Sequence, residues 1–418
     1  MSILTFSSPI PQNPNFRTHN RRLFPQASIE FERGVEFDAG DSFFRHESST
    51  ARDLGVLAAS IHRRSTSSLH ILDAMCGCGV RSLRYLSQGS ADYVWANDAN
   101  EDTRRVITSN LQRSGERGGG NMKRRWVVTH MDARRLLGER FLEREYFDLV
   151  DVDSFGGDSS FLRSAIEGVR LGGLLYVTCT NWYSSSGQQP QHSLASYGAY
   201  IRPMPYSNEI GLRMLIGGVL REAAVLGFKI TPLFSYYSYH GPVFRVMLRV
   251  TRGTFKVNGD YGFISYCNKC GNSQSYSFEE LNKIYCQYCN REAFSSLRVS
   301  GPLWSGRLHD TTYLNEMLNL AEDWGWTHSG KDGIALEKLL TKMIEESDPE
   351  LPFGFVKLDE IARRAKLNSP PISTIINTMK QDGYVASRSH IASNAIKTNC
   401  PMDICIQIAK ELRHEILM

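Results

Sequence analysis

The sequence predicts an α/β protein in which a doubly wound domain precedes a smaller domain organised by cysteines. Short apolar segments alternate with helix-like segments between residues 69 and 179, which is typical of a parallel sheet with right-handed crossovers. The first apolar segment is followed by a turn that contains Gly77 and Gly79. Further along the chain lie two Cys-x-x-Cys pairs, Cys267–Cys270 and Cys286–Cys289. These three observations define the two parts of the molecule.

Composition sets broad limits on the class of protein. A chain of 418 residues is long for a single core, so we expect two or three domains. The hydrophobic fraction of 41% and the charged fraction of 22% are ordinary for a globular protein. No run of about 18 apolar residues occurs, which argues against a membrane span. The net charge of +4 permits a nucleic-acid partner without requiring one.

The first 27 residues differ from the rest of the chain. They contain arginines, serines and prolines, and no acidic residue occurs before Glu30. This pattern is typical of an organellar transit peptide, and an ordinary disordered tail is the alternative. We therefore expect a chloroplast or mitochondrial location if the segment is a transit peptide, and the nucleus or cytoplasm otherwise.

The elements of the doubly wound domain can be placed in order. Residues 41–64 read as a loop that enters a helix, with Ser48 or Ser49 as the cap. Polar residues gather where the apolar strands end, which is the ligand-binding edge of such sheets. The expected strands are 69–74, 91–97, 126–129, 146–153, 174–179 and 243–250, and the expected helices are 80–86, 103–112 and 208–227.

The glycine turn indicates a nucleotide cofactor. Gly77 and Gly79 allow the backbone to turn sharply and approach a ligand closely. The third glycine of the dinucleotide fingerprint is missing, because Leu83 lies near its place. This disfavours a pyrophosphate and favours a smaller cofactor such as S-adenosylmethionine.

Acidic residues at successive strand ends support the same cofactor. Asp98 is placed to bind a ribose, and Asp132 with the backbone of Ala133 is placed to bind an adenine. Asp73 ends the first strand. A single acid of this kind could simply cap a loop, and that is the alternative for Asp98 and Asp132. Three acids in successive positions favour a cofactor site.

The end of the fourth strand carries candidate chemistry. Methyl transfer to an exocyclic amine needs an acceptor that hydrogen-bonds the amine and stabilises its developing positive charge. Asp153 is such an acceptor, and Phe155 could stack on a flipped-out base. Taken alone, the motif is also compatible with a helix-capping acid beside a buried phenylalanine.

The four cysteines predict a structural zinc site. The two pairs are separated by the fifteen residues 271–285, which is a zinc-ribbon spacing. Four thiolates leave no open coordination position, so the metal would organise structure rather than catalyse. Two disulfides, or a coincidental spacing, are the alternatives.

The C-terminal region predicts a winged-helix-like part. Within residues 355–398 a helix, a Ser-Pro-Pro break, a second helix and a strand-like tail follow one another. The region is rich in lysine and arginine. Modules of this kind bind nucleic acid or protein, and the sequence alone does not separate the two.

The chain resembles the tRNA (guanine(26)-N2)-dimethyltransferase family from about residue 36 to 410. The resemblance rests on ordered segments along the whole chain. They are Phe43 with Arg52-Asp53-Leu54, residues 78–84, Asn97-Asp98, Asp132-Ala133, residues 151–156, 171–178, Tyr197-Gly198, Tyr206, residues 209–213, the four cysteines and residues 301–304.

The resemblance implies a SAM-dependent tRNA (guanine-N2)-methyltransferase of Rossmann-like fold. It implies a methyltransferase domain at 28–255 and a tRNA-binding domain at 256–418, with the cysteine module at 262–295 and the winged-helix-like part at about 340–400. S-Adenosylmethionine would be contacted by Arg52, Arg81, Asp98, Asp132 and Ala133. Asp153 would engage the guanine N2, and Phe43 and Phe155 would hold the base. No obligate protein partner is evident.

Two departures from the family pattern lie near the expected substrate pocket. Ser154 stands where the family usually has proline, and Phe43-Phe-Arg-His46 replaces Phe-Tyr-Asn-Pro. They leave two alternatives open. One is a non-catalytic tRNA-binding paralogue that retains S-adenosylmethionine, and the other is a methyltransferase that acts on another RNA or on a protein.

Overall fold

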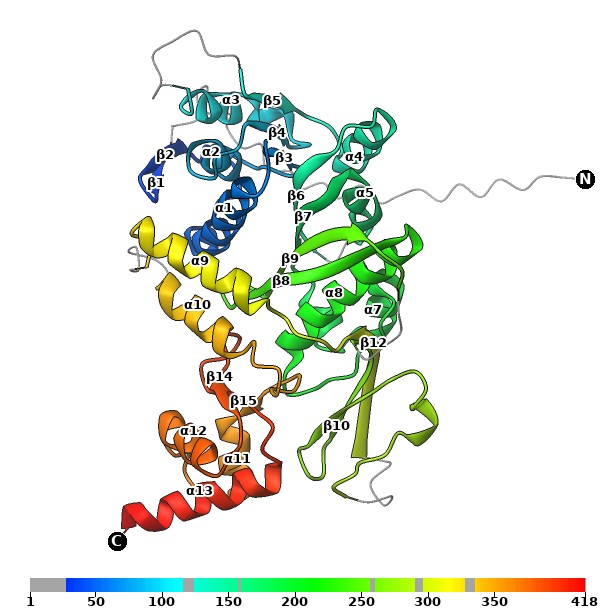
Figure 1. Ribbon diagram of the computed structural model, residues 1–418, viewed down its shortest axis with the longest axis vertical. Coiled ribbons are helices and arrows are strands. Elements are labelled where there is room, and N and C mark those ends of the chain that lie inside the picture. The colour runs from blue at the N-terminus through cyan, green and yellow to red at the C-terminus, as the bar shows by residue number, and fades with distance from the viewer. Residues whose placement is uncertain are drawn as a thin grey trace, which may run out of the picture.

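A computed structural model describes residues 28–115, 124–156, 159–255, 260–289, 296–327 and 335–417. The predicted transit-peptide segment 1–27 lies outside these residues, as do residues 290–295 of the predicted cysteine module. The largest sheet of the described residues has seven strands in the order β5-β4-β3-β6-β7-β9-β8 and extends from one end of the molecule toward its middle (Figure 1). Its strands are β3 (His70–Asp73), β4 (Tyr93–Asn97), β5 (Trp126–Thr129), β6 (Phe147–Asp153), β7 (Val169–Cys179), β8 (Phe228–Ser238) and β9 (Val243–Arg252).

The sheet is mixed and not wholly parallel. Strands β3 to β7 are parallel, as predicted, whereas β9 pairs antiparallel with both β7 and β8. Strand β8 is missing from the sequence prediction. It is an edge strand, and its register shifts between Pro232 and Phe234. A proline interrupts the pattern of a strand and is tolerated at an edge, which explains the omission.

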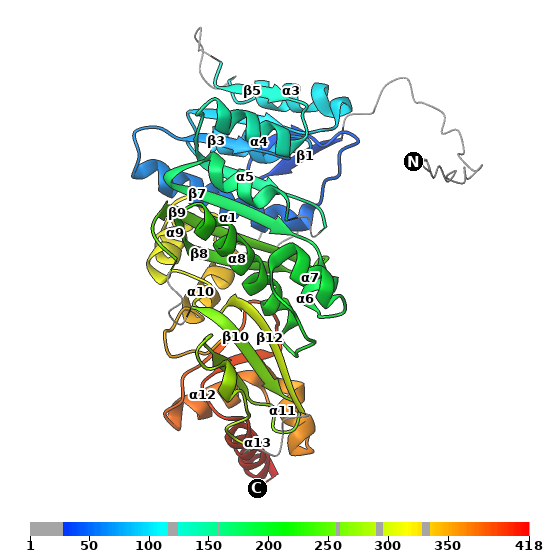
Figure 2. The ribbon, with the colours of Figure 1, turned by 90° about the vertical axis from the view of Figure 1, so that its right-hand side faces the viewer.

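Helices cover both faces of the sheet (Figures 1 and 2). One core packs α4, α5 and α8 against the sheet, and a second core packs α1, α2 and α3 against the other face. The helices are α1 (Ser49–Arg64), α2 (Val80–Ser87), α3 (Arg104–Gln112), α4 (Ala133–Leu142), α5 (Phe161–Gly168), α6 (Trp182–Ser185), α7 (Pro190–Tyr197) and α8 (Ser207–Val225). Ser48 occupies the N-cap of α1 but makes no side-chain cap hydrogen bond. Strands β1 (Ile29–Glu32) and β2 (Val35–Asp38) form a hairpin before α1.

Two helices from the second half of the chain complete the second core. Helix α9 (Thr311–Asp323) lies beside α1, and α10 (Leu336–Glu345) packs against α9, as Figure 1 shows. Tyr313 donates a hydrogen bond to the carbonyl of Ala58 in α1 at 3.2 Å, and Leu314 and Met317 are fully buried. These helices fall within the predicted segment 256–418 but share a core with the first domain.

The remaining elements form the opposite end of the molecule from β5 (Figure 2). One three-stranded sheet has the order β11-β10-β12, and another has the order β13-β15-β14. The elements are β10 (Tyr261–Cys267), β11 (Ser273–Tyr276), β12 (Leu297–Trp304), β13 (Val356–Lys357), α11 (Leu358–Ala365), α12 (Ile372–Gln381), β14 (Ala386–Arg388), β15 (Ala395–Thr398) and α13 (Met402–Leu417).

A buried charge cluster joins this end to α8. Glu209 accepts hydrogen bonds from Lys397 Nζ and from the Gly354 backbone, both at 2.6 Å, and from Arg213 Nε at 2.9 Å. Burial alone would raise the pKa of Glu209, but Lys397 and Arg213 outweigh it and lower that pKa. A paired charge of this kind fixes the geometry of a junction, because separating the partners would leave them buried and unpaired.

Among the described residues no helix is long and apolar enough to span a membrane.

Candidate active site

A cavity of about 500 Å³ opens at the carboxyl ends of β3, β4, β5 and β6. This is the edge at which doubly wound sheets bind ligands. Of the eleven non-metal residues singled out from the sequence, ten line this cavity. They are Phe43, Arg52, Asp73, Gly77, Arg81, Asp98, Asp132, Ala133, Asp153 and Phe155. Gly79 does not line it.

The glycine turn has the conformation that the sequence predicts. Gly77 and Gly79 both have positive φ, at 57° and 80°, which other residues rarely adopt. A Cβ at Gly79 would also lie 3.2 Å from Ile107 Cγ2, so this glycine allows α2 and α3 to approach each other. Asp98 Oδ2 accepts the Gly77 backbone N–H at 2.9 Å. Asp98 therefore braces the turn and also faces the cavity.

Asn97 connects three strand ends beneath the cavity. It is fully buried, and its Nδ2 donates to the carbonyls of Ala74 at 3.0 Å and Met131 at 2.9 Å. Its Oδ1 accepts the Met131 N–H at 3.0 Å. The amide therefore holds the ends of β3, β4 and β5 in register, which positions the neighbouring acidic residues.

Asp132 combines a capping role with a place in the cavity wall. It is the N-cap of α4 and accepts the backbone N–H of Arg134 at 2.9 Å. The structure therefore shows that Asp132 caps a helix and that it also lines the cavity. Ala133 is buried directly behind it, at the first position of the helix.

Arg52 is held in place by an ion pair with Glu32. The Arg52 Nη2–Glu32 Oε2 distance is 2.6 Å, and Arg52 Nε also donates to Glu32. Burial alone would raise the pKa of Glu32, but Arg52 and Arg84 lower it to about 2. A buried arginine with two of its nitrogens fixed in this way presents a rigid charge to the cavity.

A buried arginine joins two of the three acids of β6. Arg81 Nη1 donates to both oxygens of Asp151, at 2.7 and 2.8 Å, and Nη2 donates to Asp153 Oδ2 at 2.6 Å. Tyr85 also donates to Asp151 at 2.7 Å. The family resemblance assigns Arg81 to the cofactor, and the structure shows that it also orients Asp153.

Asp153 lies between two guanidinium groups at the floor of the cavity. Its Oδ1 is 3.5 Å from Arg245 Nη2, in addition to its contact with Arg81. Burial alone would raise the pKa of Asp153, but Arg245 and Arg81 outweigh it and hold that pKa well below the usual range. Asp153 is therefore an anion at neutral pH, and with 29% of its side chain exposed it remains accessible to a ligand.

Asp73 lies in an environment that raises its pKa, in contrast to Asp153. It is 1% exposed, and its Oδ2 accepts the Ser82 hydroxyl at 2.7 Å. Burial and the neighbouring carboxylate of Asp151 raise the pKa of Asp73 to about 7. Two acids of one cavity thus differ widely in proton affinity because one faces arginines and the other faces a carboxylate.

The loop after Asp153 is anchored to the end of β7. The Ser154 hydroxyl donates to the carbonyl of Thr178 at 3.1 Å. Gly156 N–H donates to Thr180 Oγ1 at 2.6 Å, and Thr180 N–H donates to the Gly156 carbonyl at 2.9 Å. The hydroxyl of Ser154 therefore secures the loop where the family pattern has a proline ring.

Two exposed phenylalanines stand at the cavity mouth. Phe43 is 61% exposed and Phe155 is 68% exposed, and their ring centroids lie 5.0 Å apart at an interplanar angle of 77°. Arg45 lies over the Phe43 ring at 4.7 Å and donates to the His240 carbonyl. Two exposed rings in contact with each other at the mouth of a cavity form an apolar patch of the kind that marks a binding site. Phe155 is thus not the buried phenylalanine of the alternative interpretation.

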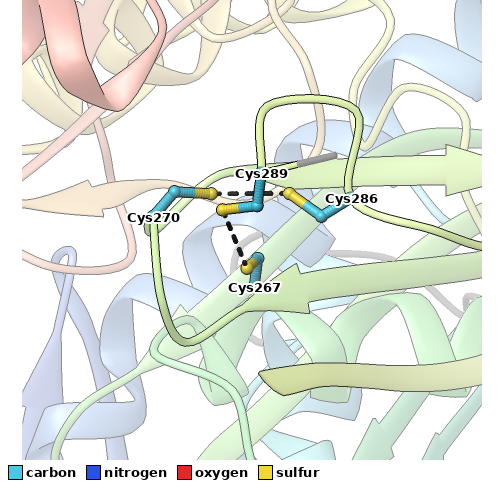
Figure 3. Close-up of side chains that lie close together, drawn as sticks. All are labelled: Cys267, Cys270, Cys286 and Cys289. Atoms are coloured by element: carbon cyan, nitrogen blue, oxygen red, sulfur yellow. Dashed lines mark hydrogen bonds between the residues drawn. The ribbon is translucent and has the colours of Figure 1, made fainter. Parts of the chain in front are cut away.

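The four cysteines converge on one point (Figure 3), and none of them lines this cavity. Cys267 and Cys289 sulfurs are 3.9 Å apart, and Cys270 and Cys286 sulfurs are 3.5 Å apart. These separations exclude disulfides, whose sulfurs are about 2.05 Å apart. They match the edges of a tetrahedron with metal–sulfur bonds of about 2.3 Å. The alternative of two disulfides is therefore wrong.

Sequence reasoning missed two residues of the cavity region. Asp151 belongs to the motif at residues 151–156, but the sequence assigns it no role. In the structure it holds the guanidinium of Arg81. Arg245 was missed because it lies 92 residues from Asp153 along the chain and meets it only through an antiparallel strand. The available clue was a lone arginine within the buried and otherwise apolar run 243–248.

Comparisons with known proteins agree with this geometry. Residues 26–410 match the family described as N2,N2-dimethylguanosine tRNA methyltransferase. A tRNA (guanine(26)-N(2))-dimethyltransferase from Thermococcus kodakarensis is 30% identical over 405 residues, which cover 94% of this chain and 97% of the relative. A protein of the same name from Pyrococcus horikoshii is 28% identical over 406 residues, which cover 93% of this chain and 96% of that relative. The solved structure of Trm1 from Pyrococcus horikoshii with S-adenosyl-L-methionine matches with a TM-score of 0.74 at 25% identity, covering 91% of this chain and 99% of that chain.

Proposed function

Because the chain belongs to the N2,N2-dimethylguanosine tRNA methyltransferase family, we propose that it transfers methyl groups from S-adenosylmethionine to the exocyclic N2 of a guanine in tRNA. The names of its relatives point to guanine 26. The observation that carries the proposal is the single cavity that brings together the acids of four strand ends, an ionised Asp153 and two exposed aromatic rings.

The cavity fits an adenosyl cofactor. Asp98 and Asp132 lie at adjacent strand ends, where a ribose and an adenine need polar partners, and the Gly77 turn leaves room for close approach. Arg52 supplies a fixed positive charge for a carboxylate. When bound, S-adenosylmethionine supplies an electrophilic methyl group on a sulfonium.

Asp153 provides the environment that an exocyclic amine needs during transfer. As an anion it accepts a hydrogen bond from the amine and stabilises the positive charge that develops on nitrogen. Because its pKa lies well below the usual range, it is a weak base, and its main contribution is electrostatic. Arg81 keeps the carboxylate oriented, so little reorganisation is required during the reaction.

The rings of Phe43 and Phe155 provide a binding surface for an unstacked base. They extend into solvent at the mouth while Asp153 lies at the floor of the same cavity. Base–aromatic stacking contributes about 1–3 kcal/mol per base. Enzymes that act on a base within folded nucleic acid must extrude it, and stacking offsets part of that cost.

The anchored loop favours an active enzyme over a non-catalytic paralogue. The departure at Ser154 raised that alternative, since a proline would fix the backbone next to Asp153. The hydrogen bond from Ser154 to Thr178 and the two bonds between Gly156 and Thr180 fix the same backbone by other means. The catalytic geometry therefore does not depend on the proline.

We further propose a structural Zn²⁺ at Cys267, Cys270, Cys286 and Cys289, supported by their sulfur separations. The module is tied to α11 through Arg364, whose Nη1 donates to the Lys269 carbonyl at 2.8 Å. Helices α11 and α12 with strands β13, β14 and β15 would form the winged-helix-like unit that holds the tRNA backbone. Contacts of that kind position the substrate without reading its sequence.

The test of the proposed function is a transfer assay on the full chain. Labelled S-adenosylmethionine and unmodified tRNA transcripts are incubated with the protein, and the RNA is digested to nucleosides for mass spectrometry. Formation of N2-methylguanosine or N2,N2-dimethylguanosine supports the proposal. Retained binding of both ligands without transfer would instead establish the non-catalytic alternative.

A further inference from the structure

Arg245 is a buried charge in the cavity wall that is incompletely paired. Only 4% of it is exposed, and it extends from the third residue of β9 toward Asp153 at the end of β6. Its Nη2 reaches Asp153 Oδ1 at 3.5 Å, which is at the limit of a hydrogen bond. Its Nε and Nη1 are buried and have no hydrogen-bond partner among the described residues.

This arrangement differs from that of the other buried arginines of the cavity. Arg81 makes three hydrogen bonds to two carboxylates, and Arg52 makes three to Glu32. An unpaired donor on a desolvated guanidinium carries a substantial free-energy penalty, which an incoming acceptor can relieve. Arg245 therefore has unused donor capacity beside the acid that faces the substrate.

Resting on the proposed function, we propose that Arg245 determines specificity by donating a hydrogen bond to O6 of the target guanine, while Asp153 accepts from N2 and N1. The two side chains lie next to each other at the floor of one cavity, as the donor and acceptor groups do along that edge of guanine.

The pair discriminates guanine from adenine by its charges. Adenine presents an amino group at the position of O6 and an unprotonated N1 in place of N–H. Arg245 would then face a donor and Asp153 would face a lone pair, so both contacts would be repulsive. Polar groups that are left unpaired in this way reject the wrong substrate strongly.

The experiment compares guanine with 6-thioguanine at the target position of a tRNA that the wild-type protein methylates. This base keeps N1–H and the N2 amine and replaces only O6 by sulfur, a weaker acceptor. Arg245→Met is expected to lower kcat/KM on the guanine substrate by about 10- to 100-fold, the effect of one charge-assisted hydrogen bond. The same substitution should change kcat/KM on the 6-thioguanine substrate far less.

Two further variants make the comparison decisive. Arg249→Met alters an arginine on the same face of β9 that does not line the cavity, and its preference for guanine should equal that of the wild type. Arg245→Lys keeps a charged donor and should retain part of the preference for guanine, so it also tests the proposal if Arg245→Met fails to fold.

The outcomes separate the inference from the proposed function. Equal losses on both substrates in the Arg245 variants would overturn the contact with O6 and leave Arg245 a structural role. A marked loss of S-adenosylmethionine affinity in Arg245→Met, measured by calorimetry, would also overturn it, because the unused donors would then serve the cofactor. Absence of transfer by the wild-type protein to any tRNA would overturn the proposed function, and the inference with it.

Discussion

Replacing Asp153 by asparagine tests whether its carboxylate is the catalytic group. Asp153→Asn keeps the shape of the side chain and removes its charge. In the wild type the carboxylate is paired with Arg81 at 2.6 Å and with Arg245 at 3.5 Å, and 29% of it is exposed. The substitution therefore removes the anion that would face the substrate amine while Arg81 keeps its contacts with Asp151.

The expected loss of activity follows from this geometry. Removing one preorganised electrostatic partner of a developing charge typically lowers kcat by about 100- to 1,000-fold. Affinity for S-adenosylmethionine should stay nearly unchanged, since Asp98, Asp132 and Arg52 are untouched. Single-turnover transfer to a tRNA transcript measures the first quantity, and isothermal titration with S-adenosylmethionine measures the second.

Stability supplies an independent check on the charge of Asp153. Because its folded pKa is lowered from 3.8, the ionised side chain stabilises the fold above that pH, and this contribution is lost as the pH falls toward the folded pKa. The wild type should therefore exceed Asp153→Asn in stability by about 1–2 kcal/mol at neutral pH, with the difference shrinking below pH 3.8.

A matched control is available at the opposite ends of the strands, where β4 begins. Asp92 pairs with Arg63 at 3.0 Å just before β4 and does not line the cavity, so Asp92→Asn should leave kcat unchanged. The assignment is refuted if Asp153→Asn retains full transfer activity, or if it loses cofactor binding to the same extent as transfer.

Three further outcomes are expected. Ser154→Ala removes the hydrogen bond to Thr178, so kcat in the transfer assay should fall about fivefold with little change in cofactor affinity; an unchanged kcat would show that the loop needs no such anchor. Cys286→Ser should lower both the zinc content, measured by mass spectrometry of the metal, and the thermal midpoint of unfolding, and a metal-free wild type would contradict the site. Asp73 has a folded pKa of about 7, raised from 3.8, so its neutral form stabilises the cofactor-free fold at low pH and this contribution is lost as the pH rises toward 7. Melting temperatures should therefore fall less between pH 5 and about 8 for Asp73→Asn than for the wild type, and parallel pH profiles would contradict the shift.

Much of the cavity could be predicted because its residues follow local rules. The strand-end positions of Asp73, Asp98 and Asp132 depend on short apolar runs, and the positive φ of Gly77 depends on a turn that the sequence shows directly. Parallel strands then bring these ends to one edge, whatever the details of packing. The cysteine spacing is equally local.

The residues that escaped prediction depend on contacts between distant segments. Arg245 meets Asp153 only because β9 inserts beside β7 in the antiparallel direction. The role of Arg81 as a brace for Asp153 likewise depends on the closeness of α2 to the end of β6. The pKa of Asp73 is raised by burial and by the carboxylate of Asp151 on the neighbouring strand, a pairing that the strand register creates. No local pattern in the sequence contains this information.

The most direct test of the central claim uses one tRNA transcript with guanine at position 26 and a second with inosine there, whose base lacks the N2 amine. The full chain should form N2-methylated guanosine in the first transcript and should transfer no label to the second. The second transcript should nevertheless compete with the first, because inosine keeps O6 and N1–H for the same site. Equal labelling of both transcripts would contradict the account, since the methyl group would then reach some other nucleotide.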